Sequence, residues 1–253
     1  SPYYLVNKSL RFRSSASAYL SRTPSSTGSQ TIWTWSGWIK RGKLTSGQHF
    51  FSQGNSALST YVRAYVNFNG SDQIQFTSVN SSNSVDADVY TTAVFRDPSA
   101  WYHILLAIDT SQATSTNRIK LYVNGVQQTL TFSTTPSQNA SLGINTVQAM
   151  KLGADYQGAT NFDGYMAEVY FVNNQQLTPS SFGETNSDGV WMPKSYTGTY
   201  GTNGFYLPFT NTTSTTTLGY DSSGNGNNWT PNNISLTSGC LLYTSDAADD
   251  TPC

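Results

Sequence analysis

The chain has 253 residues, of which only 11% are charged, and its formal net charge at pH 7 is -1. Because no long basic run is present, the chain lacks the phosphate-neutralising surface on which nucleic-acid binding depends. No stretch approaches the roughly 18 apolar residues of a membrane-spanning helix, so we expect no membrane insertion.

Short segments that alternate apolar and polar residues recur up to about residue 210, and a period of two is the pattern of a half-buried strand. Many short strands separated by Gly, Asn and Ser turns predict an all-β sandwich or barrel. The segments 31–40 and 101–109 are apolar at both parities, as in strands at the middle of a covered sheet. In chain order the clearest strands are Ser9 to Arg13, Thr31 to Lys40, Tyr61 to Phe68, Gln73 to Thr77, Trp101 to Asp109, Arg118 to Val123 and Tyr165 to Val172.

Two local signals refine this pattern. Asn124 and Gly125 lie between two alternating runs, and both tolerate the positive φ of a type I′ turn, which predicts a β-hairpin. Helix is indicated only at "LTPSSFGE", where Thr178 could cap a single turn and Pro179 could occupy its first position.

Taken in order, these elements resemble the laminin G-like domains of the concanavalin A-like lectin/glucanase superfamily. The most specific segment is "FDGYMAEVYFVNNQQLTPSSF", with which such domains typically end. The resemblance covers about residues 9 to 182 and implies an antiparallel two-sheet jelly roll, which we assign to residues 1–200. The other matching segments are "SLRFRSSASAYLSR", "WTWSGWIKRG", "HFFSQGN", "WYHILLAID" and "IKLYVNGV".

The segment 201–239 contains "GFYLPFTNTTSTTTLGYDSSGNGNNWT", which is similar to the part that follows this domain in structural and tail-fibre-like proteins of bacteriophages, many of them known from environmental sequencing. It either begins a further region or packs against the sandwich. The resemblance implies a location on the virion surface, with other virion proteins and host-surface polysaccharide as partners. Tail-fibre relatives also suggest a homotrimer, although no heptad run in the sequence supports one.

The final segment, residues 240–253, holds both cysteines, Cys240 and Cys253. As protein it would close a small disulfide loop and indicate an oxidising compartment. However, "CLLYTSDAAD" resembles the in-frame translation of a transposase-based sequencing adapter. We therefore interpret the segment as an assembly artefact and expect it to be disordered. The protein proper would then be cysteine-free, with 13 basic against 11 acidic residues.

Catalytic signatures are missing from the sequence. Glycoside hydrolases that retain configuration need two carboxyl groups about 5–5.5 Å apart. The only glutamates, Glu168 and Glu184, lie outside the Glu-x-Asp-x-x-Glu strand of the enzymatic relatives. The only histidines are His49 and His103. His103 falls inside an expected strand, at a place where the resembling domains also carry a structural histidine, so we expect a core or interface role for it. Neither a GxSxG nor a phosphate-loop motif is present, so we predict a protein that is not an enzyme.

Calcium is a candidate cofactor, because Ca²⁺ takes oxygen ligands and the resemblance implies a loop rim at which some laminin G-like domains bind it. The candidate ligands are Asp155, Asn161, Asp163 and Asp109. The alternative interpretation is that these side chains only make turns through hydrogen bonds to the backbone.

Sugar recognition would use aromatic rings for the C–H faces and polar side chains for the hydroxyl groups. The candidate ligand-binding residues are Tyr156, Gln157, Tyr61 and Tyr65. We expect a non-catalytic carbohydrate-binding or adhesion module of a phage virion. The alternatives are a purely structural virion domain and an extracellular bacterial adhesin.

Overall fold

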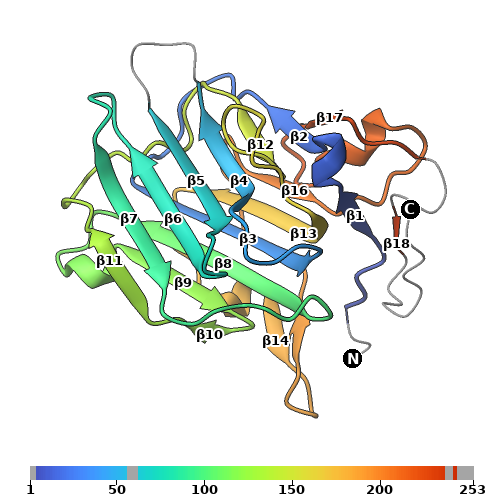
Figure 1. Ribbon diagram of the computed structural model, residues 1–253, viewed down its shortest axis with the longest axis horizontal. Helices are drawn as coiled ribbons and strands as arrows, with labels where there is room; N and C mark the ends of the chain where they lie inside the picture. Colours follow the sequence, from blue (N-terminus) through green and yellow to red (C-terminus); the bar gives the residue numbers. More distant parts are fainter. Residues whose placement is uncertain (1–3, 56–61, 237–241, 244–253) are drawn as a thin grey trace.

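The computed structural model describes residues 4–55, 62–236 and 242–243, and consists of two antiparallel sheets packed face to face (Figure 1). In spatial order, sheet A contains β10 (Val126–Gln127), β9 (Ile119–Val123), β8 (Trp101–Asp109), β3 (Ile32–Arg41), β13 (Gly164–Asn173), β1 (Ser9–Phe12) and β18 (Leu242–Tyr243), and β16 (Phe205–Leu207) also pairs with β13. Sheet B contains β11 (Leu130–Thr134), β7 (Val85–Thr91), β6 (Ile74–Val79), β5 (Arg63–Phe68), β4 (Gln48–Gly54), β12 (Met150–Leu152), β2 (Tyr19–Arg22) and β17 (Thr230–Asn232). The predicted all-β, concanavalin A-like jelly roll is confirmed.

Helical structure in the described residues is limited to four 3₁₀ turns. None of the described helices is long and apolar enough to span a membrane. The predicted turn at 178–179 is such a 3₁₀ turn, with Pro179 at its start. Thr178 makes no side-chain cap, because its hydroxyl pairs with that of Ser180 instead. The four turns are η1 (Ser14–Ala16), η2 (Ser115–Asn117), η3 (Pro179–Ser181) and η4 (Thr216–Gly219).

The core lies between the inner faces of the sheets and is largely aromatic. Trp33 and Trp35 of β3 are fully buried, as alternate residues on one face of a strand should be. Trp33 stacks on Phe171 of β13 with ring centroids 5.7 Å apart, and Trp35 stacks on Phe51 of β4 at 5.9 Å. Each buried side chain of this size stabilises the fold by about 1.5–3 kcal/mol, so the aromatic residues dominate the cohesion of the two sheets.

Strands β3 and β8 are neighbours at the middle of sheet A and are buried on both faces, as predicted. A second, smaller apolar cluster on the outer face explains this burial, since Leu105 and Ala107 of β8 pack there with Tyr170 of β13. Residues 174–204 supply the cover, with Phe182 and Tyr196 buried in the cluster. This segment includes the small hairpin of β14 (Gly183–Thr185) and β15 (Trp191–Pro193).

The Asn124–Gly125 hairpin is also confirmed. Both residues have positive φ, 49° and 80°, and Val123 pairs with Val126 across the turn. The Asn124 side-chain oxygen accepts a hydrogen bond from the His103 N–H at 2.8 Å. The turn is therefore tied to the neighbouring strand β8.

The segment after residue 200 packs on the sandwich. Phe205 of β16 stacks on Phe171 with centroids 5.8 Å apart, and Trp229 meets Phe205 edge-on at 4.8 Å. Asp221 accepts hydrogen bonds from the backbone of Tyr206, Ser223 and Asn227, and these bonds close the "DSSGNGNN" loop. The domain division near residue 200 stays a prediction. Of the adapter-like segment, β18 pairs with β1, and the other residues lie outside the described part.

Candidate functional site

The outer face of sheet B carries a polar row that crosses the strands. Sheet B lies in front of sheet A in Figure 1, so this face points toward the viewer. Since side chains alternate along a strand, residues paired across strands share one face. The register places the following residues in one row, from β11 to β17: Thr134, Asp88, Thr77, Tyr65, Ser52, Lys151, Ser21 and Thr230.

Two predicted sugar-binding residues, Tyr65 and Tyr156, lie in the same region of the outer face, around β4 and β5. The Tyr65 ring meets the His49 ring edge-on, with centroids 4.6 Å apart. Arg63, two residues before Tyr65 and on the same face, has its guanidinium 5.4 Å from the centroid of the Tyr156 ring. Gln157, next to Tyr156, is exposed. Three of the four predicted residues therefore lie in one region of sheet B, and Tyr61 lies outside the described residues.

Asp155 builds the loop that carries Tyr156 and Gln157. Its carboxylate accepts hydrogen bonds from the backbone N–H groups of Gln157 at 2.9 Å and Ala159 at 2.8 Å. It also accepts one from the Thr160 hydroxyl at 2.9 Å. Lys151 fixes the other side of the loop, because its Nζ donates to the backbone oxygen of Tyr156 at 2.7 Å. Burial lowers the pKa of Lys151. The aromatic side chain is thus presented by an ordered loop.

The four calcium candidates do not form one cluster. Asp155 and Asn161 share the loop just described, and Asn161 donates weakly to the backbone oxygen of Gly158 at 3.4 Å. Asp163 accepts from Arg11 Nη2 at 2.7 Å and from the Ser14 backbone N–H at 3.0 Å. In the described part of the chain, no three or more His, Cys, Asp or Glu side chains gather as a metal site.

The fourth candidate, Asp109, closes the turn after β8. It accepts from the Ser111 backbone N–H at 3.0 Å, and from the Gln112 side chain at 2.7 Å. Burial raises the pKa of both Asp109 and Asp163, and the donors around each outweigh this effect and hold the pKa below its usual value. Asp109 therefore closes its own turn, whereas Asp163 ties the start of β13 to Arg11 of β1 and Ser14 of η1. The calcium assignment itself stays a prediction.

The opposite end of the polar row is acidic. Asp88 of β7 accepts hydrogen bonds from Gln75 Nε2 at 2.7 Å and the Thr77 hydroxyl at 3.0 Å. Burial raises the pKa of Asp86, two residues earlier. The outer face of sheet B thus offers two rings beside cationic donors at one end and carboxylate acceptors at the other, as an extended polar ligand would require.

His103 and Ser36 form a contact on the outer face of sheet A that superficially resembles a catalytic dyad. The Trp191 indole donates to His103 Nδ1 at 3.0 Å, and His103 Nε2 lies 2.8 Å from Ser36 Oγ. Since indole N–H is only a donor, Nδ1 must be unprotonated, and Nε2 therefore donates its proton to Ser36. Burial lowers the pKa of His103 to about 3. In this arrangement His103 cannot accept the serine proton as a base would.

Glu168 is a buried carboxylate whose surroundings the sequence analysis missed. It accepts hydrogen bonds from the hydroxyls of Tyr4 at 2.8 Å, Tyr170 at 2.9 Å and Tyr206 at 2.8 Å. Burial raises the pKa of Glu168, and the three hydroxyls partly oppose this. Its backbone has φ of 50° at a bulge in β13, which turns the side chain out of the regular alternation. The single acidic residue within the apolar run "YMAEVYFV" was the available signal.

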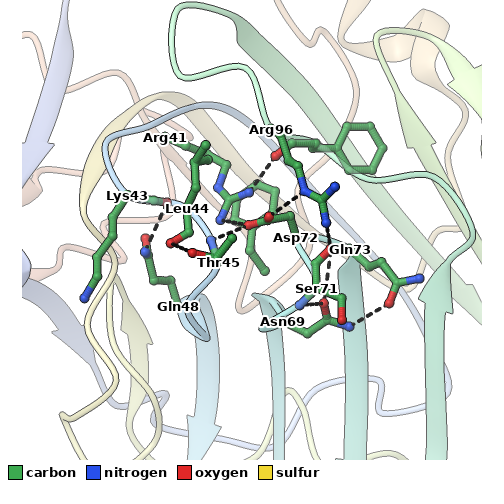
Figure 2. Close-up of polar contacts among 12 residues, drawn as sticks. Arg41, Lys43, Leu44, Thr45, Gln48, Asn69, Ser71, Asp72, Gln73 and Arg96 are labelled. Atoms are coloured by element: carbon green, nitrogen blue, oxygen red, sulfur yellow. Dashed lines mark hydrogen bonds and ion pairs between the residues drawn. The ribbon is translucent and has the colours of Figure 1, made fainter.

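A buried ion-pair network, also missed, ties the two sheets together at one rim (Figure 2). Asp72, in the turn between β5 and β6, lies 3.0 Å from Arg41 Nη2 and 2.8 Å from Arg96 Nε. Its Oδ1 also accepts from the Thr45 backbone N–H at 2.7 Å. Burial raises the pKa of Asp72, yet these donors hold it below its usual value. The Arg41 and Asp72 side chains are fully buried, whereas Arg96 is 56% exposed, and the buried pair positions the rim loops.

The sequence of this chain matches the family model described as the concanavalin A-like lectin/glucanases superfamily (Laminin_G_3) over residues 14–181. The match covers more than half of the chain, and the protein belongs to this family. No curated protein matches the chain.

Three solved structures illustrate the likeness of the fold. A Bacteroides ovatus structure described as a "putative carbohydrate binding protein" has a TM-score of 0.53 and 15% identity, covering 96% of this chain and 61% of that one. Domains LG4-5 of mouse laminin α1 have a TM-score of 0.49 and 13% identity, covering 78% and 47%. A SAP-like pentraxin of Limulus polyphemus has a TM-score of 0.47 and 13% identity, covering 68% and 78%. The chain spans less than two thirds of the first two.

Proposed function

We propose that the protein is a non-catalytic glycan-binding module whose site lies on the outer face of sheet B, around Tyr65 and Tyr156. The observation that carries the proposal is that Tyr156, from a distant loop, lies against Arg63, which is two residues from Tyr65 on the same face of β5. Lys151 holds the backbone of the Tyr156 loop. Rings of this kind stack on the C–H faces of sugars, and the neighbouring donors and acceptors pair with hydroxyl groups.

Membership of the lectin/glucanase superfamily supports this proposal. So does the description of the Bacteroides ovatus protein of the same fold as carbohydrate-binding, although at 15% identity that likeness concerns the fold alone. A catalytic role has less support, because Glu168 is enclosed by hydroxyl groups and His103 is held as a proton donor to Ser36. A role in glycan binding without catalysis agrees best with the surroundings of Glu168 and His103.

We further propose that the module is displayed on the surface of a bacteriophage particle, in a tail fibre or as capsid decoration, where it adheres to host-surface polysaccharide. The support is the resemblance of the segment 201–239 to its counterpart in phage structural proteins. Other virion proteins are then its neighbours, and a homotrimer is the expected assembly. Light scattering of the purified chain tests the trimer, and a monomer at micromolar concentration would contradict it.

Glycan binding is tested with an array of bacterial surface polysaccharides and the full chain, with and without Ca²⁺. Saturable binding is expected, and Tyr65→Ala or Tyr156→Ala should weaken it about tenfold, the equivalent of about 1.4 kcal/mol for one aromatic contact. Tyr220→Ala is the matched control, since Tyr220 is 42% exposed and lies outside the polar row. Its affinity should equal that of the unaltered protein.

Two results would overturn the proposal. The first is no binding to any polysaccharide at millimolar sugar concentration, which would leave the purely structural virion domain as the better account. The second is binding that Tyr65→Ala and Tyr156→Ala leave unchanged, which would move the site away from sheet B. A requirement for Ca²⁺ would favour the predicted ligands Asp155 and Asn161, and independence from Ca²⁺ would favour their role in the turn.

A further inference from the structure

The part of the polar row on β6 and β7 is rich in hydrogen-bond acceptors and poor in donors. Asp88 Oδ1 accepts from Gln75 Nε2 at 2.7 Å and from the Thr77 hydroxyl at 3.0 Å. Both donors act on the same oxygen, and Asp88 Oδ2 has no hydrogen-bond or ion-pair partner among the described residues. Asp88 is partly exposed and Oδ2 is not one of its buried atoms, so a ligand can reach this oxygen.

Asn67 of β5 shows the same shortage of donors. The register pairs it with Gln75, so its side chain lies beside that of Gln75 on the outer face, and only 6% of it is exposed. Its Nδ2 donates to the backbone oxygen of Phe68 at 3.3 Å, which fixes the orientation of the amide. Its Oδ1 has no partner in the described part of the chain. Since buried acceptors in proteins are normally paired, this region lacks donors that a ligand would supply.

The ring of Tyr90 adds a second group that attracts cations. Tyr90 lies two residues after Asp88 on β7, and therefore on the same face. The register pairs it with Gln75, the residue that donates to Asp88. The side chain is partly exposed and contacts no other ring among the described residues. An aromatic face and a carboxylate side by side favour a positively charged group over a neutral hydroxyl.

The charge of this edge of sheet B is negative. Strands β6, β7 and β11 form the edge (Figure 1) and contain no Lys or Arg, whereas β7 carries Asp86 and Asp88. Arg63, at the Tyr65 end of the row, contacts Asn83 at 3.1 Å and the ring of Tyr156. The described residues therefore leave the charge of Asp88 without a counter-ion, and such a surface attracts cations.

We propose that Asp88 and Tyr90 form a subsite for a sugar that carries a free amino group. This inference names the substrate class of the glycan site on sheet B and rests on the function proposed for it. Tyr65 and Asp88 are joined in register through Thr77 and lie two strands apart, which corresponds to about 9.5 Å. An oligosaccharide that lies across the strands can therefore place one sugar on Tyr65 and the ammonium group of another at Asp88.

The chemistry of an ammonium group matches the groups around it. It has three donors and no acceptor, which answers the shortage of donors at Asp88. Its charge pairs with the carboxylate and is attracted to the face of the Tyr90 ring. An N-acetylated amino sugar has a single N–H and no charge, so it should bind this subsite more weakly.

The test uses the full chain and glucosamine oligosaccharides prepared from chitosan, compared with the same oligosaccharides after N-acetylation. Binding is measured at about pH 6, below the pKa of an amino group. The free-amine form should bind more tightly, and the difference should shrink as salt is added. Asp88→Asn should weaken binding of the free-amine form about three- to fivefold, the upper range for a partly exposed ion pair, and leave the N-acetylated form nearly unchanged. Tyr90→Leu should weaken it about two- to fivefold.

Asp188→Asn is the matched control. Asp188 is exposed in the turn between β14 and β15, outside the polar row, and its replacement changes the net charge by the same amount. Its affinity for the free-amine form should equal that of the unaltered protein. Asp88→Asn keeps an oxygen that accepts from Gln75 and Thr77, so the variant should fold, and urea unfolding checks this.

Three outcomes would overturn the subsite. They are no binding of the free-amine form, equal affinity of the unaltered protein for the two forms, and equal losses in Asp88→Asn and Asp188→Asn. Failure of the subsite alone leaves the polysaccharide binding that Tyr65→Ala weakens. Failure of the proposed function removes that binding as well, so the two failures can be told apart.

Discussion

The two outer faces of the sandwich have the same strand geometry but different surroundings. On sheet A, Tyr170 of β13 and Leu105 of β8 are buried under residues 174–204. On sheet B, the corresponding outward positions hold a polar row around Tyr65, which is only partly buried. Similar aromatic residues can therefore serve stability on one face and remain available to a ligand on the other. The sequence difference lies at the outward positions of the strands, apolar on β8 and polar on β6 and β7.

The largest expected effect is a loss of stability, and it tests whether one outer face is covered and the other is open. Tyr170→Ala should lower the free energy of unfolding by about 3–5 kcal/mol, because it leaves a cavity in a covered cluster. It also removes the hydroxyl that donates to Glu168. Tyr65→Ala should cost about 1 kcal/mol or less, the range for a partly exposed side chain with one ring contact. Urea unfolding of both variants measures the difference, and equal losses would show that sheet B's outer face is also covered.

A smaller effect comes from His103, because the folded protein disfavours the second proton that would make its ring cationic. Its pKa is lowered by burial to about 3, whereas an unfolded chain binds a proton below about 6.5. Between these values the unfolded state holds more protons, so stability is lost as the pH falls. At about 1.4 kcal/mol per pH unit at most, the loss between pH 6 and pH 4 should be about 2–3 kcal/mol.

His103→Gln removes the titrating group and serves as the reference for this measurement. The unfolding free energy of the unaltered protein should fall relative to that of the variant as the pH is lowered from 6 to 4. His49→Gln provides the comparison on sheet B. Burial also lowers the pKa of His49, but its ring is less enclosed, so the slope that it contributes should be smaller. If the unfolding free energies of the unaltered protein and His103→Gln changed with pH in parallel, the folded protein would not lower the pKa of His103.

The features that sequence could predict are those encoded within one short segment. Apolar residues at both parities predicted that β3 and β8 are buried on both faces, and the pair Asn124–Gly125 predicted its hairpin. These signals depend on local backbone geometry and on the period of a single strand. The third local signal predicted the turn at Pro179 correctly and the cap by Thr178 wrongly, because the Thr178 hydroxyl pairs with that of Ser180.

The features that sequence could not predict join distant segments. Asp72 meets Arg41 and Arg96 only because the sandwich brings the turn after β5 beside the end of β3 and the loop between β7 and β8. Tyr4 and Tyr206 reach Glu168 from opposite ends of the chain. The calcium candidates show a different limit, since a carboxylate uses the same oxygens for a turn and for an ion, and residue type alone does not separate the two roles.

The smallest effect concerns Glu168, and its sign is opposite to that of His103. Burial raises the pKa of Glu168, so the folded protein keeps this proton at a pH where the unfolded chain has lost it. In that window, which begins near the ordinary value of about 4.3, stability falls as the pH rises. The unaltered protein should therefore lose stability relative to Glu168→Gln on going from pH 4 to pH 7. The slope should stay below the limit of about 1.4 kcal/mol per pH unit, because the tyrosine hydroxyls oppose the effect of burial.

Urea unfolding of the unaltered protein and of Glu168→Gln between pH 4 and pH 7 gives this slope. If the difference between them did not change with pH, or changed in the opposite direction, the hydroxyls would outweigh burial and Glu168 would be ionised without cost in the folded state.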